Sequence, residues 1–134
     1  MRPIPMQRLA SFVPLPGLLA EFGIAVEDVL AGSGLQPDDL RADKFIDFSR
    51  YIEILDRAAA LTGCEDFGLR LGLRQSVAAL GPLGEVLRSA ATLGDALADF
   101  AAFQIANGSG GAVYLHRLGP DYAVGYGVYD APAR

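Results

Sequence analysis

Side chains suited to catalysis are few in this chain. It contains one histidine, His116, and one cysteine, Cys64. The imidazole could act as a general base toward Ser109 or Cys64, but neither of these residues lies in a recognisable nucleophile motif. One histidine and one cysteine leave carboxylates as the only other strong metal ligands, and no close cluster combines them. We therefore predict no catalytic residue, no metal site and no cofactor; an enzyme would have to depend on His116 and the scattered carboxylates.

Two further features of the sequence could suggest a catalytic or phosphate site. Neighbouring acidic residues on a helix or turn point in different directions and cannot share a proton, so we interpret the acidic pairs as solvated surface groups. The pairs are Glu27-Asp28, Asp38-Asp39 and Glu65-Asp66. The glycine-rich run at 107–111 follows a predicted helix and precedes a predicted strand, which is the reverse of the order in phosphate-binding loops. We interpret it as a flexible connection.

Aromatic residues are concentrated toward the carboxyl end and could line a cavity for an apolar or aromatic ligand. Core packing is the alternative use of the same side chains. They do not form a nucleic-acid stacking surface without basic partners, because the net charge is −5 and Lys44 is the single lysine. The candidate ligand-binding residues are Phe103, Tyr114, His116 and Tyr126.

Composition limits the class of protein. A chain of 134 residues fits one domain with one core. Charged residues interrupt every apolar segment, so no membrane span is expected. The first residues lack the apolar stretch of a secretory signal, and a lone cysteine fits a reducing compartment. We therefore expect a cytoplasmic domain without direct contacts to DNA or to a membrane.

Short helices are expected to position these residues. The early prolines predict an extended tail over residues 1–14. The clearest helix is expected at 47–61, with Gly63 as its terminator and with Phe48, Ile52 and Leu55 as its core stripe. Shorter helical segments are predicted at 16–22, 26–31, 37–40 and 67–71, from Gly81, and from Thr92 to about Asn107.

Near the carboxyl end the hydrophobic period changes to two, which predicts strands at 112–118 and 122–129 joined by a turn. The expected fold class is α+β: a bundle of short helices followed by an antiparallel β-hairpin that forms part of a sheet. The second strand lacks the charged or proline residues that usually protect an exposed edge, so a homodimer interface is expected there. The candidate interface residues are Val124, Tyr126, Val128 and Tyr129.

Three segments, in their order and spacing, resemble a known protein family. Their sequences are DFGLRLG at 66–72, LGPLGEVL at 80–87 and ATLGDAL at 91–97. Together they are similar to the amino-terminal, arabinose-binding-like domain of AraC-type bacterial transcription regulators. The similarity extends from about Pro16 to Tyr129.

The resemblance implies a domain at 15–134, incomplete at its carboxyl end, that senses a small-molecule effector and dimerises. It also implies that DNA is bound by a carboxyl-terminal domain absent from this chain. The effector is not implied, because members of the family respond to diverse compounds. A structural or protein-interaction module without a small-molecule ligand is the alternative, and a closed core without a pocket would favour it.

Overall fold

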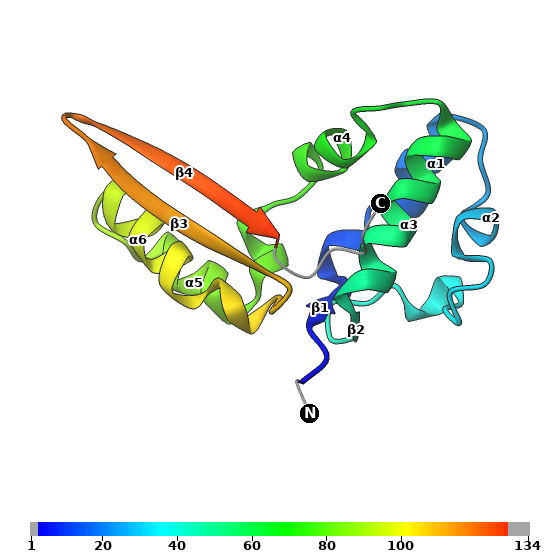
Figure 1. Ribbon diagram of the computed structural model, residues 1–134, viewed down its shortest axis with the longest axis horizontal. Helices are drawn as coiled ribbons and strands as arrows, with labels where there is room; N and C mark the ends of the chain where they lie inside the picture. The colour runs from blue at the N-terminus through cyan, green and yellow to red at the C-terminus, as the bar shows by residue number, and fades with distance from the viewer. Residues whose placement is uncertain (1–2, 129–134) are drawn as a thin grey trace.

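A computed structural model describes residues 3–128 and shows two lobes (Figure 1). The helical lobe comprises β1 (Met6–Arg8), η1 (Leu9–Phe12), α1 (Leu15–Glu21), α2 (Val26–Leu30), η2 (Pro37–Asp39), β2 (Phe45–Asp47), α3 (Phe48–Thr62) and α4 (Phe67–Leu73). The hairpin lobe follows η3 (Val77–Leu80) and comprises α5 (Pro82–Arg88), α6 (Leu93–Phe103), η4 (Gln104–Ala106), β3 (Gly111–Leu118) and β4 (Asp121–Val128). The predicted α+β class is confirmed.

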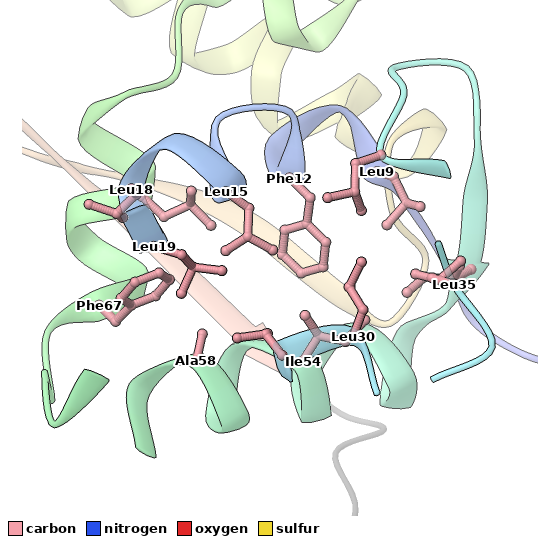
Figure 2. Packing of buried hydrophobic residues seen from close by; sticks show 14 of the residues in the cluster. Leu9, Phe12, Leu15, Leu18, Leu19, Leu30, Leu35, Ile54, Ala58 and Phe67 are labelled. Carbon is pink, nitrogen blue, oxygen red and sulfur yellow. The ribbon is translucent and has the colours of Figure 1, made fainter. Parts of the chain in front are cut away.

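The principal hydrophobic core lies in the helical lobe. In Figure 2 the side chains of η1 and α1 face those of α3 across this core. Phe12, Leu15 and Phe67 are fully buried, and Ile54 and Ala58 cover the core from α3. Because apolar burial is the main favourable contribution to folding, these contacts hold the short helices together.

The prediction of an extended tail over residues 1–14 is wrong for the segment from Met6 to Phe12. β1 pairs antiparallel with β2, and Leu9 and Phe12 have no exposed surface. The backbone N–H of Phe48 donates to the carbonyl of Pro5 at 2.8 Å. The extended backbone that Pro3 and Pro5 favour suits the pairing of β1 with a strand, but the chain then turns into the 3-10 helix η1 instead of staying extended up to Pro14.

Helix α3 is confirmed as the long helix, but its buried face differs from the predicted stripe. Phe48 is buried, as predicted, whereas Ile52 and Leu55 are half-buried and the core positions are Ile54 and Ala58. Apolar residues occur on several sides of this helix, so spacing alone allowed more than one stripe. The packing of α2 and α4 against α3 selects the face that is buried.

The ends of α3 follow local signals in the sequence. At its start the side chain of Asp47 accepts a hydrogen bond from the N–H of Arg50 at 3.1 Å, which is the geometry of an N-cap. That hydrogen bond is the main reason why the pKa of Asp47 lies below its ordinary value. At the other end Gly63 has a φ of 66°, so the predicted terminator is confirmed.

The predicted hairpin is also confirmed, and its register sorts the side chains onto two faces. Val113 pairs with Tyr126 and Leu115 pairs with Val124, so these residues share one face. Tyr122 lies on the same face, and a Cβ added to Gly94 of α6 would come within 2.9 Å of the Tyr122 hydroxyl. This face of the hairpin therefore lies toward α6. Tyr114 and its neighbours lie on the opposite face. Within residues 3–128 the hairpin forms a sheet of two strands.

The glycine-rich run joins the two lobes and is not the flexible connection that we expected. β1 lies between β2 and this run: Arg8 N–H donates to the Asn107 carbonyl at 2.7 Å, and Ser109 N–H donates to the Met6 carbonyl at 2.9 Å. Gly110 is buried against the ring of Phe48, where any side chain would collide with that ring. The glycines therefore permit a close backbone approach between distant parts of the chain.

Candidate functional site

An apolar cavity lies where the two lobes meet, and we call it the junction cavity. It has two adjoining parts of about 310 and 300 Å³, and both are lined by Gln7, Leu80, Phe100 and Asn107. The first part also contacts β1, η1 and the segment at 75–79, and the second contacts the α6-facing side of the hairpin. Cavities of this size that combine apolar walls with a few polar groups are typical of small-molecule sites.

Hydrogen bonds hold the helical-lobe wall of the junction cavity in place. The guanidinium of Arg8 donates to the side-chain oxygen of Asn107 at 3.2 Å and to the carbonyl of Ala42. A glycine at position 81, with a φ of 61°, leaves room for the guanidinium, since a Cβ there would crowd it. The side-chain amide of Gln75 donates to the carbonyl of Ser11 at 2.7 Å. The cavity wall thus combines parts of the chain that are far apart in sequence.

A stack of aromatic rings connects this wall to the core. The hydroxyls of Ser11 and Tyr51 are 2.7 Å apart, and the Tyr51 ring stacks on Phe12 with ring centroids 4.4 Å apart. Burial raises the pKa of Tyr51, and the nearby Tyr126 adds to this shift, so the phenol stays neutral at physiological pH. Ser11 lines the junction cavity, so a ligand there would lie beside a residue that is hydrogen-bonded to the half-buried Tyr51 of α3.

Of the four residues predicted to bind a ligand, the structure places Tyr126 at the junction cavity, where it lies with Val113 and Val124. The other three lie elsewhere. Tyr114 and His116 are exposed on the outer face of the hairpin, with their ring centroids 5.9 Å apart, and Phe103 is 55% exposed on α6. None of these three lines the junction cavity within the described part of the chain.

One signal in the sequence could have separated these residues. A two-residue turn at Gly119-Pro120 pairs Leu118 with Asp121, and counting back from that pair places Tyr114 and Tyr126 on opposite faces. No comparable signal in the sequence indicates that Gln7 and Arg8 line the cavity, because their position depends on the docking of β1 against residues 107–109.

The predicted interface residues lie along β4. Val124, Tyr126 and Val128 are 53%, 56% and 41% exposed, and Tyr129 lies outside the described residues. Val124 and Tyr126 also line the junction cavity, so the predicted interface and the cavity share these two residues.

A second hollow, of about 320 Å³, lies between α2 and α3 and is lined by Arg50, Glu53 and Arg57 among others. Its arginines already have partners in the protein. Arg50 approaches the Asp47 carboxylate at 3.7 Å, and Arg57 donates to the carbonyl of Ala31. The junction cavity is the better candidate because it joins two lobes and has more apolar walls.

The remaining reactive side chains have structural partners. Cys64 is buried, and its thiol donates to the Asp66 carboxylate at 2.9 Å, which raises the pKa of the thiol and lowers that of Asp66. The acidic pairs are exposed apart from the half-buried Asp39. Within residues 3–128, no group of three His, Cys, Asp or Glu side chains is close enough to hold a metal ion. No helix in the same range is long and apolar enough to cross a membrane.

Comparison with known proteins gives two results. A family model described as the arabinose-binding domain of AraC transcription regulator, N-term, matches residues 23–130. The chain is also similar to the HTH-type transcriptional regulator VirS of two Mycobacterium tuberculosis strains, CDC 1551 / Oshkosh and ATCC 25618 / H37Rv. In each case 41% of 51 residues are identical, and the match spans 38% of this chain but only 15% of the regulator.

Proposed function

Because the chain belongs to the family of N-terminal arabinose-binding domains of AraC transcription regulators, we propose that it binds a small-molecule effector in the junction cavity. The observation that carries this proposal is an apolar cavity with polar groups from both lobes. A ligand there contacts β1, η3, α6 and the hairpin at once. It can therefore favour one relative placement of the two lobes over another, which is the physical requirement for a signal.

In this proposal the domain acts within a longer, cytoplasmic regulator and transforms no substrate. Sequence-specific DNA binding belongs to a separate domain of that regulator, because this chain has a net charge of −5. The sensing domain includes the residues before position 15, since Gln7 and Arg8 line the junction cavity. The chemistry of the cavity walls determines which effector can bind. The word arabinose in the family description does not identify that effector.

We expect the purified chain to be stabilised by its effector in a thermal-shift screen of metabolites. A ligand at 100 times its dissociation constant adds about 2.7 kcal/mol to the free energy of unfolding. The variant Leu80→Trp should lose this response, because Leu80 lines both parts of the cavity and the larger ring fills them. The control Leu69→Trp, at a side chain that is 66% exposed on α4, should keep it.

A broad screen in which no metabolite stabilises the chain would contradict effector binding and favour the structural or protein-interaction module. The same conclusion would follow if Leu80→Trp responded as strongly as the unsubstituted chain.

We further propose that the chain forms a homodimer through β4. Within the described residues β4 pairs only with β3, and no charged residue lies between Tyr122 and Val128. An edge strand of this kind recruits another strand, and pairing of two identical edges about a two-fold axis closes the assembly.

Light scattering at micromolar concentration is expected to give the mass of a dimer. Val128→Lys should shift the chain to a monomer, because each copy would bring a positive charge onto the edge that has to pair. The control Val13→Lys changes a side chain that is 52% exposed beyond η1 and should remain dimeric. A monomeric unsubstituted chain, or a Val128→Lys dimer, would rule out this interface.

A further inference from the structure

Arg8 differs from the other arginines of residues 3–128 in its surroundings. It alone is half-buried, whereas the others are exposed. Several exposed arginines pair with carboxylates, as Arg70 does with Asp66 at 3.1 Å and Arg88 with Glu85 at 3.0 Å. Arg8 has only uncharged hydrogen-bond partners within the described residues, namely the carbonyl of Ala42 and the side-chain oxygen of Asn107.

Among residues 3–128, the guanidinium therefore has no anionic partner for its positive charge, which lies beside an apolar cavity. A half-buried cation without an anion is unfavourable, and a guanidinium matches a carboxylate through two parallel hydrogen bonds. Neither of these hydrogen bonds uses the second terminal nitrogen, Nη2. The side-chain nitrogen of Asn107, another donor at the cavity wall, also donates no hydrogen bond within residues 3–128.

The remaining walls define the rest of the ligand. Val77, Leu80 and Phe100 line the part of the cavity next to Arg8, and Val113 and Val124 line the adjoining part. Within residues 3–128, no lysine and no second arginine lines either part. The chain is also acidic overall, so a multiply charged anion such as a phosphate would lack partners among these residues.

We propose that the effector is an organic monocarboxylate with an apolar body, and that its carboxylate binds the Arg8 guanidinium while the body fills the junction cavity. This inference rests on the proposed function. It adds the chemical class of the ligand and the residue that distinguishes an acid from its uncharged analogues. Because Arg8 also holds Asn107, binding at this residue acts directly on the connection between the two lobes.

The test measures dissociation constants by calorimetry for alkanoates and arylalkanoates of graded length, each against its primary amide. An acid is expected to bind about 10- to 100-fold more tightly than its amide, as one charge-assisted hydrogen-bonding pair allows. Arg8→Gln should remove this preference, because it weakens binding of the acid much more than binding of the amide. Added salt should weaken binding of the acid and spare the amide.

The matched control is Arg57→Gln, because Arg57 is an exposed arginine that also donates to a backbone carbonyl but lies outside the junction cavity. It should retain the full preference for the acid. If Arg8→Gln does not fold, Arg8→Lys keeps the charge without the planar fork, and a reduced preference in that variant supports the same conclusion.

Four results would overturn the inference. Equal binding of acids and amides, or equal loss of both in Arg8→Gln, shows that Arg8 has a purely structural role, and the proposed effector function survives. If only uncharged metabolites bind, the inference is likewise overturned and the proposed effector function survives. If neither the panel nor the metabolite screen yields a ligand, both this inference and the proposed function fail.

Discussion

Phe12→Ala is expected to destabilise the protein by about 3–5 kcal/mol, the range for removing a large aromatic side chain from a core. Phe12 has no exposed surface, and its ring stacks on Tyr51 at an interplanar angle of 7°. The loss is a large part of the roughly 5–15 kcal/mol by which a domain is normally stable. Urea denaturation followed by circular dichroism measures it.

Phe103→Ala is the matched control for this prediction. The same side chain is removed at a position that is 55% exposed, so we expect a change within about 0.5 kcal/mol. A Phe12→Ala variant as stable as Phe103→Ala would show that the segment before α1 does not belong to the core.

Ile54→Ala should cost about 2–5 kcal/mol, because the side chain is 2% exposed and lies in the core cluster between α3 and the first helices. The cost has two components: the lost burial of the removed methyl and methylene groups, and the cavity that remains because the surrounding helices relax only partly. Thermal and urea denaturation of the variant measure this cost.

Ile52→Ala provides the comparison on the same helix. Ile52 is half-buried and does not belong to the core cluster, so its removal should cost clearly less than that of Ile54. If the two variants lost equal stability, or if Ile52→Ala lost more, the buried face of α3 would be the stripe that the helical spacing predicts.

Features that depend on nearby residues were predictable from the sequence. Asp47 and Gly63 mark the ends of α3, and the change from helical spacing to alternation marks the start of the hairpin. Likewise, Thr92 caps α6 by accepting the N–H of Asp95 at 3.1 Å. Such signals act through backbone preferences and hydrogen bonds within a few residues, so they operate before any tertiary contact forms.

The candidate site was predictable only in part. Tyr126 was assigned to it because aromatic residues accumulate near the carboxyl end, but the same reasoning included Tyr114 and His116, which lie on the other face of the hairpin. Strand alternation separates the two faces of each strand. Which face meets α6 is decided by packing, and composition contains no information on that choice.

The burial of η1, the core face of α3 and the position of Arg8 were decided by tertiary structure alone. Each depends on contacts between segments far apart in the chain, such as the hydrogen bond from Arg8 N–H to the Asn107 carbonyl. Several faces of α3 are apolar enough to be buried, so the sequence determines that α3 is a helix. Its neighbours decide which of those faces loses contact with water, because burial free energy is a property of the assembled surfaces.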